Sequence, residues 1–312
     1  MKNVRQTRHM TVLQDLHSSR RPNLFAALEL IKPITWFPPM WAYTCGAISA
    51  GVSFDSQIWI VFLGIFLAGP VVCGMSQAAN DWCDRHVDAI NQPERPIPSG
   101  RIPGKWGLWI ALIMTVISMI LGLFLGVWGF VATIVAVAAA WAYSAEPLRF
   151  KKSGWLGPGL VGLCYEGLPW FTGAAVISAS MPSPKVIIIA ALYAIGAHGI
   201  MTLNDFKALE GDRQTGIRSL PVILGPRLAA LVACITMAIS QFIIVLLLYI
   251  WIGPSLHGIA ISALILGQVW AMQIMMRDPK AKAPWYNATG VTMYVSGMMI
   301  CAFALRALEA GL

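Results

Sequence analysis

Charged residues are scarce in this sequence. Asp, Glu, Lys and Arg make up 12% of its 312 residues, whereas a soluble domain carries about 25%. Hydrophobic residues make up 57% of the chain, and its mean hydropathy is +0.68. So few charges exclude an ordinary soluble domain, and apolar runs long enough to cross a bilayer recur along the chain. The sequence therefore predicts an all-α, polytopic membrane protein.

Paired cysteines are also lacking. None of the six cysteines belongs to a Cys-x-x-Cys pair, and each lies alone in or beside an apolar run: Cys45, Cys73, Cys83, Cys164, Cys234 and Cys301. This distribution indicates neither a disulfide framework nor a zinc site. We expect these side chains to pack as small apolar groups.

The beginning of the chain lacks the apolar core of a signal peptide. Residues 1–24 are polar and basic. We interpret them as a cytosolic tail that precedes a single intramembrane domain over residues 25–312.

Apolar segments predict nine membrane-spanning helices. The run from Trp106 to Tyr143 contains no charge and is too long for one helix, so we expect it to turn at residues 126–129. The nine predicted spans are roughly 34–54, 58–79, 106–125, 127–144, 159–178, 186–204, 227–251, 256–276 and 288–308.

The basic residues fall almost entirely on one side of these spans. Twenty of the 22 Lys and Arg residues lie in the N-terminal segment or in the loops after the second, fourth, sixth and eighth spans, and only Lys185 and Arg306 lie on the other side. By the positive-inside rule the N-terminus and the long loops are cytoplasmic and the C-terminus is outside. The formal net charge of +8 is then a topology signal, and no nucleic-acid partner is expected.

A polar motif, Asn80-Asp81-x-x-Asp84-x-x-x-Asp88, follows the second span. At about 100° per residue all four side chains share one face if the helix continues past the membrane edge. They then lie at a helix C-terminus, where the backbone dipole is already negative. Divalent cations would relieve the repulsion, and Mg²⁺ prefers carboxylates, water and substrate phosphate. The alternative is a solvated acidic loop paired with Arg85 and Arg95, and this motif alone does not decide between the two.

A second motif favours the cation site. Asn204-Asp205 and Glu210-x-Asp212 follow the sixth span, four spans after the first motif, and each motif is followed by Arg-x-x-Pro. This spacing indicates a pseudo-repeat of four-helix units that brings two acidic helix ends together around a central cavity. Two facing sets of carboxylates with metal between them can hold a diphosphate.

Two ionisable residues fall inside predicted spans. Glu166 lies about nine residues into the fifth span and His198 about seven before Asp205, so each is roughly 10–13 Å deep at 1.5 Å per residue. A place on a cavity wall is one interpretation, and a helix–helix hydrogen bond is the other. The depth favours function for Glu166 and leaves His198 undecided.

These motifs resemble those of the UbiA superfamily of intramembrane prenyltransferases. The segments 88–101 and 204–213 are similar to its chlorophyll and bacteriochlorophyll synthase branch, and segments 80–86, 155–160 and 164–170 are most similar to the purple-bacterial members of that branch. The resemblance extends from Leu30 to Leu305.

The resemblance implies a fold, a reaction and a cofactor. The fold would be nine helices around a central cavity that opens laterally to lipid. The enzyme would transfer a geranylgeranyl or phytyl group from its diphosphate to the propionate carboxylate of bacteriochlorophyllide a and release diphosphate. Mg²⁺, with Mn²⁺ as the alternative, would bind the diphosphate.

The resemblance also assigns roles to residues. The metal ligands would be Asn80, Asp84, Asp88, Asp205, Glu210 and Asp212, with Asp81 beside them. Glu210 is included because the chain has Ala208 where many relatives carry another Asp. The substrate-binding residues would be Arg95, Arg101, Tyr143, Lys151, Arg213 and His198, the last as an axial ligand of the tetrapyrrole Mg. The catalytic residues would be Asp84, Asp205 and Glu166.

Several alternatives remain open at this stage. Within the superfamily the acceptor could instead be chlorophyllide a, a quinone or haem. In another class, a secondary transporter also has internal repeats and buried ionisable groups, but its acidic site would lie near the bilayer midplane. The resemblance places the protein in a bacterial inner membrane, with proteins of pigment biosynthesis or photosystem assembly as expected partners.

Overall fold

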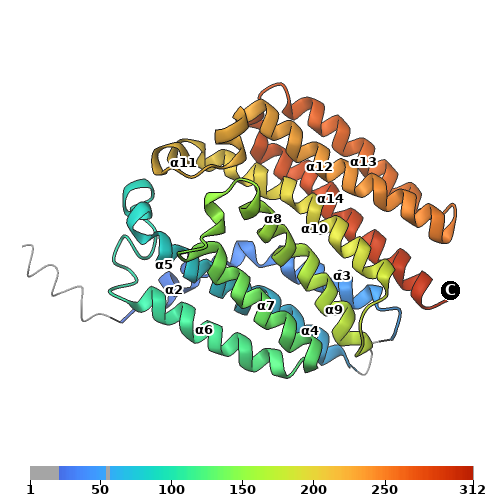
Figure 1. Ribbon diagram of the computed structural model, residues 1–312, viewed down its shortest axis with the longest axis horizontal. Coiled ribbons are helices and arrows are strands. Elements are labelled where there is room, and N and C mark those ends of the chain that lie inside the picture. The colour runs from blue at the N-terminus through green and yellow to red at the C-terminus, as the bar shows by residue number, and fades with distance from the viewer. Residues whose placement is uncertain (1–20, 54–56, 312) are drawn as a thin grey trace, which may run out of the picture.

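The computed structural model describes residues 21–53 and 57–311, which form one bundle of helices (Figure 1). No strand occurs in this described part of the chain, apart from a single bridge between Ser153 and Arg218. The predicted all-α class is therefore confirmed. The predicted tail over residues 1–24 lies mostly outside the described residues.

Three long helices are uninterrupted, namely α6 (Trp106–Leu123), α7 (Gly126–Ser144) and α13 (Leu256–Met275). Three more are compound and contain a turn of different geometry. They are α4 (Ile58–Phe66) with η3 (Leu67–Cys73) and α5 (Gly74–Asn91), α8 (Leu156–Gly162) with η5 (Leu163–Gly167) and α9 (Leu168–Ser178), and α10 (Pro184–Asn204) with η6 (Asp205–Ala208) and α11 (Leu209–Thr215). The last two are α12 (Leu220–Ile252) and α14 (Pro279–Glu309).

The prediction of nine spans is wrong by one, because eight helices in the described residues are long and apolar enough to cross a membrane. The predicted first span contains only the short helices α2 (Leu24–Leu30) and η1 (Pro33–Thr35) and the 13-residue α3 (Phe37–Ser49). At 1.5 Å per residue α3 is about 20 Å long, less than the ~30 Å hydrocarbon core. Pro33 lies before α3, and Gly51, whose φ is +73°, ends it.

Local residues explain the interruptions. Pro70 has no N–H for the helical ladder and lies inside the π-helical turn η3. In α12, Gly225 has a φ of +77° and precedes Pro226, so the helix kinks there. The predicted seventh span begins at residue 227, directly after this kink. A second π-helical turn, η5, contains Glu166, and π turns occur often at functional sites.

Glycines let α3 pack closely against α9. A Cβ on Gly46 would lie 2.0 Å from the carbonyl oxygen of Trp170, and a Cβ on Gly173 would lie 2.2 Å from that of Tyr43. Small residues at helix contacts are the usual means of close packing in membranes. This pair of glycines holds α3 inside the bundle although the helix is short.

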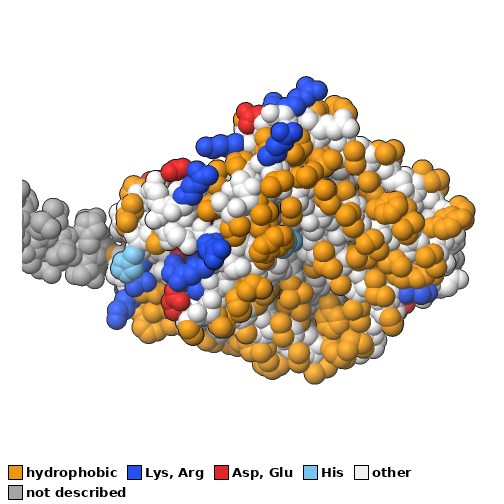
Figure 2. All heavy atoms as spheres, turned by 45° about the horizontal axis from the view of Figure 1, so that its top comes forward, with side chains coloured by type: hydrophobic (Ala, Val, Ile, Leu, Met, Phe, Trp, Pro, Cys, Tyr) orange, Lys and Arg blue, Asp and Glu red, His pale blue; other side chains and the backbone are white. Residues whose placement is uncertain are grey.

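Charge gathers at one end of the bundle. Figure 2 shows Lys, Arg, Asp and Glu clustered where α5 and α11 end, while hydrophobic side chains cover most of the rest of this face. Exposed apolar residues such as Val116, Ile250 and Leu266 lie on the outer helices. In Figure 1 the described chain begins at the charged end and its C-terminus lies at the opposite end.

Candidate active site

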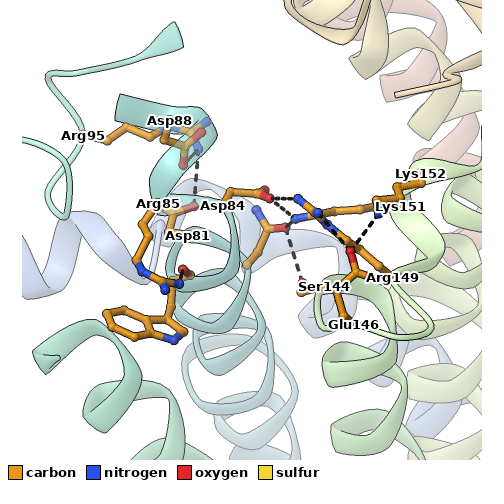
Figure 3. Close-up of polar contacts among 12 residues, drawn as sticks. Asp81, Asp84, Arg85, Asp88, Arg95, Ser144, Glu146, Arg149, Lys151 and Lys152 are labelled. Carbon is orange, nitrogen blue, oxygen red and sulfur yellow. Dashed lines mark hydrogen bonds and ion pairs between the residues drawn. The ribbon is translucent and has the colours of Figure 1, made fainter. Parts of the chain in front are cut away.

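The first motif lies entirely on a helix. Because α5 continues to Asn91, its side chains project from successive turns in two directions (Figure 3). Asn80 and Asp84 point toward the end of α7 and the loop after it, whereas Asp81 and Asp88 point toward Arg95.

Two cations hold Asp84. The ammonium of Lys151 lies 2.5 Å from Asp84 Oδ1 and also donates to Asn80 Oδ1 at 3.0 Å. Arg149 Nη2 donates to Asp84 Oδ1 at 3.0 Å, and the Ser144 hydroxyl lies 3.3 Å from Asn80 Oδ1. The helix η4 (Phe150–Lys152) thus closes over the first motif.

Two further cations neutralise the other face of the motif. Arg95 Nη1 donates to Asp88 Oδ2 at 2.7 Å and lies 3.5 Å from Asp81 Oδ1. Lys32 Nζ lies 2.6 Å from the same Asp81 oxygen. Asp81 is only 2% exposed, and its Oδ2 has no hydrogen-bond partner among the described residues.

The loop carries its own electrostatic support. Glu146 accepts from Lys152 at 2.7 Å and from Arg149 at 3.2 Å, and these hydrogen bonds lower the pKa of the Glu146 carboxyl. Burial lowers the pKa of Lys151, although the neighbouring Asp84 carboxylate opposes that effect. Glu146 therefore helps to hold the Arg149 guanidinium in place. The Lys151 side chain is buried, with only 7% of it exposed.

The second motif lies at the same end of the bundle. Asp205 begins η6 and the buried Asp212 lies in α11. A Cβ on Gly211 would lie 3.3 Å from Asn91 Nδ2, so α11 meets the end of α5. Asp84, Asp205 and Asp212 are all close enough to Tyr143 to interact with it electrostatically. The repeat prediction that the two acidic helix ends meet agrees with this placement.

The carboxylates of the second motif are not neutralised in the same way. Among the described residues, no Lys or Arg forms an ion pair with Asp205 or Asp212. Asn204 accepts from Asn287 Nδ2 at 3.2 Å, which ties this motif to α14. The second motif therefore differs from the first, whose acids are already engaged by Lys and Arg.

Three predicted site residues lie apart from this cluster. Arg101 forms a bidentate ion pair with Glu29 and is 43% exposed. Arg213 and Glu210 lie 4.0 Å apart on the outer face of α11, with 52% and 72% of their side chains exposed. As placed here, none of the three reaches the buried acids.

The two intramembrane candidates lie elsewhere in the bundle. Glu166 is 2% exposed, lies near Cys45 and Tyr294, and its Oε2 has no partner among the described residues. His198 packs against Trp155, with ring centroids 5.6 Å apart, and its Nδ1 lies 3.5 Å from the Thr202 hydroxyl.

Sequence reasoning missed three residues of the cluster. Arg149, Ser144 and Lys32 contact the first motif, and neither their spacing nor their type distinguished them from other cations and hydroxyls at the membrane edge.

The described residues contain no preformed group of three or more His, Cys, Asp or Glu side chains arranged for a metal. The reason is visible in the geometry, since Lys and Arg already engage the acids of the first motif (Figure 3). The donor set nevertheless fits a hard divalent cation, because it consists of oxygen atoms. Asp205 and Asp212, which have no Lys or Arg ion-pair partner among the described residues, belong to this donor set.

A small apolar cavity lies deeper in the bundle. It has a volume of about 50 Å³ and is lined by α3, α4, η3, α7, η5 and α9, including Tyr43, Val72, Ala136, Cys164 and Leu168. The bundle therefore has a cluster of acidic and basic side chains at one end and an apolar interior below it.

Fold and site together define a multi-pass membrane protein whose acidic and basic side chains gather at one end of the bundle. A family model described as the UbiA prenyltransferase family matches residues 35–297. The chain belongs to this family and is a prenyltransferase, which confirms the enzyme interpretation over that of a transporter.

Similar proteins agree with this assignment. The bacteriochlorophyll synthase 33 kDa chain of Cereibacter sphaeroides is 63% identical over 96% of this chain and 99% of its own length. The chloroplastic chlorophyll synthase of Oryza sativa is 34% identical over 89% and 76%. Among solved structures, a UbiA homologue from Archaeoglobus fulgidus bound to DMAPP and Mg²⁺ superposes with a TM-score of 0.69, at 19% identity, over 90% of this chain and 99% of that one.

Proposed function

We propose that the protein acts as a bacteriochlorophyll synthase. It transfers a geranylgeranyl or phytyl group from the diphosphate to the propionate carboxylate of bacteriochlorophyllide a. The observation that carries this proposal is the 63% identity over nearly the full length of the Cereibacter sphaeroides protein of that name, against 34% to the plant chlorophyll synthase.

A divalent cation fits the two acidic motifs. Mg²⁺, with Mn²⁺ as the alternative, would be held by Asn80 and Asp84 from α5 and by Asp205 and Asp212 from the second motif. Asp88 would have to leave Arg95 and turn toward Asp84 to join them. Glu210 would have to turn inward from its exposed position to join them. When bound, the cation supplies positive charge that stabilises the leaving diphosphate.

The chain's own cations complete the headgroup site. Lys151 and Arg149 lie within hydrogen-bonding distance of Asp84, and Arg95 and Lys32 neutralise the other face of the motif. Fixed cations aimed at the place where negative charge develops need little reorganisation during the reaction. We assign Lys151 and Arg149 to the diphosphate oxygens.

The transfer needs no base. The allylic C–O bond breaks and its electron pair stays on the diphosphate oxygen. A lone pair of the acceptor carboxylate, already ionised at neutral pH, then forms the new C–O bond of the ester. The protein therefore has to orient two substrates, stabilise the departing diphosphate and exclude water from the allylic carbon.

The proposal extends to location. The positive-inside rule places the charged end of the bundle in the cytoplasm of a bacterium, at its inner membrane, so the N-terminus is cytoplasmic and the C-terminus outside. Proteins that make the pigment or assemble photosystems are the expected neighbours of such an enzyme.

The test is turnover by purified protein in detergent. With geranylgeranyl diphosphate, Mg²⁺ and bacteriochlorophyllide a, we expect diphosphate release in step with an esterified pigment identified by mass spectrometry. Chlorophyllide a, a quinone and haem serve as parallel acceptors. Faster turnover of any of them than of bacteriochlorophyllide a would overturn the proposed acceptor.

A further inference from the structure

A hydrogen-bonded group lies just below the acidic motifs. The Tyr165 hydroxyl accepts from Gln77 Nε2 at 3.0 Å, and Cys73 Sγ lies 3.4 Å from the same hydroxyl. Cys73 Sγ also lies 3.3 Å from the carbonyl oxygen of Thr35. These contacts tie η5 to the helix of the first motif and to η1.

This group separates the charged end from the apolar cavity. Along the α4–α5 helix, Val72 lines the cavity, Cys73 and Gln77 hold Tyr165, and Asn80 begins the polar motif. From Val72 to Asn80 the helix rises about 12 Å. The neighbours of Tyr165 in η5 and α9, Cys164 and Leu168, also line the cavity.

The same order holds on α7. Ala136 lines the cavity, and Ser144, two turns further on, lies 3.3 Å from Asn80 Oδ1. Tyr143, next to Ser144 at the same end of α7, lies near Tyr165 and near the acids of both motifs. Tyr165 is thus at the level where a charged head ends and an apolar chain begins.

We infer that Tyr165 is a catalytic residue whose ring covers the allylic carbon and stabilises the positive charge that builds there as the diphosphate leaves. This inference rests on the proposed prenyl transfer. A cation over an aromatic face is stabilised by the ring quadrupole, most strongly when water is excluded.

The hydrogen-bond partners of Tyr165 explain why its phenol is not alkylated by the allylic cation. The hydrogen bond from Gln77 engages a lone pair of its oxygen, and Cys73 Sγ lies 3.4 Å from the same oxygen, so the phenol is a poor nucleophile toward the cation. The acceptor carboxylate then captures the allylic carbon instead. Gln77 and Cys73 are positioning residues, since they act only through Tyr165.

The test compares two ligands that need no acceptor pigment. One is geranylgeranyl amine, a cation at neutral pH, offered with diphosphate and Mg²⁺. The other is geranylgeranyl thiolodiphosphate, which carries no positive charge at the same position. Their dissociation constants are measured for the wild type, Tyr165→Phe and Tyr165→Leu.

We expect Tyr165→Leu to weaken binding of the amine by roughly 30-fold, which corresponds to about 2 kcal/mol for a desolvated cation–π contact, and that of the thiolodiphosphate by less than about threefold. Tyr165→Phe keeps the ring and should bind both ligands within about threefold of wild type. Equal losses for the two ligands in the Leu variant would overturn the inference.

Two additions keep the test decisive. If the Leu variant is not monodisperse, a fluorinated phenylalanine at position 165 weakens the ring quadrupole at nearly constant shape, and selective loss of amine binding is again expected. Gln77→Leu removes one hydrogen bond to a ring that stays in place, so like Tyr165→Phe it should leave the amine-to-thiolodiphosphate affinity ratio within about threefold of wild type. Because no acceptor is present, failure here is distinguishable from failure of the acceptor assignment, which only turnover of bacteriochlorophyllide tests.

Discussion

At the residue scale, the proposed diphosphate site depends on individual carboxylates. Asp84 and Asp205 come from helices far apart in the chain, and both interact electrostatically with Tyr143. If they share one cation and one diphosphate, loss of either destroys the site. We expect Asp84→Ala and Asp205→Ala each to lower turnover at least about 100-fold, in protein that remains folded and inserted in the membrane.

Glu210→Ala is the matched control, since Glu210 is acidic, lies in the same motif and is 72% exposed. We expect it to lower turnover less than Asp205→Ala does. More than a few per cent of wild-type turnover in Asp84→Ala or Asp205→Ala would contradict their assignment as ligands.

Neighbouring lysines offer a second comparison. Lys151 is almost fully buried and contacts Asn80 and Asp84, whereas Lys152 is 53% exposed and contacts Glu146. Lys151→Met should lower kcat/KM for the prenyl diphosphate about 100-fold, while Lys152→Met should stay within about twofold. Equal effects of the two substitutions would show that bulk charge, rather than this contact, matters.

Part of the site could be predicted from residue spacing. Asn80, Asp84 and Asp88 stand out because carboxylates at a helix C-terminus are unfavourable without a counter-charge. Lys32, Ser144 and Arg149 do not stand out, because their role depends on which chain segments meet in space. Glu210 is a predicted ligand because this chain has Ala208 where many relatives carry another Asp, and its exposed position in α11 follows from the helix register.

At the scale of helices, close packing of α3 against α9 contributes to the stability of the bundle. Gly173→Ala would place its Cβ 2.2 Å from the carbonyl of Tyr43, so α3 and α9 would have to separate. Such overpacking costs about 1–3 kcal/mol, and we expect a lower Tm in detergent. Gly258→Ala in α13 meets its nearest atom at 3.5 Å and should leave Tm unchanged or higher, since alanine favours helix. An unchanged Tm for Gly173→Ala would contradict the close contact.

The length of the apolar sequence segments predicted most of the long helices, because a helix must have a minimum length to cross the bilayer. It failed at α3, where proline and glycine shorten the helix. It also could not show that α5 continues to Asn91 or that η3 and η5 are π-helical, since polar helix extensions and π turns leave no hydropathy signal.

At the scale of the whole molecule, the orientation of the chain in the membrane can be tested. The described chain begins at the charged end of the bundle and finishes at the opposite end (Figure 1), and eight helices in the described residues have full membrane length. We expect a reporter enzyme that works only outside the cytoplasm to be active when fused to the C-terminus. A reporter that works only in the cytoplasm should be active when fused after Lys152. Activity of both on the same side would contradict this topology.

The internal repeat let the sequence predict that both motifs lie at one end of the bundle. Of the cations that engage the first motif, Arg95 and Lys151 were among the predicted site residues. Lys32 and Arg149 were not predictable, because their role depends on which separate loops meet in space. Their engagement also explains why the described residues show no ready-made metal cluster.

The most direct measurement is binding of geranylgeranyl thiolodiphosphate to the purified protein with and without Mg²⁺. The account predicts tight binding only with Mg²⁺, and loss of that binding in both Asp84→Ala and Asp205→Ala. Equal affinity in the presence of a chelator, or unchanged Mg²⁺-dependent binding in either variant, would contradict a headgroup held jointly by the two acidic motifs.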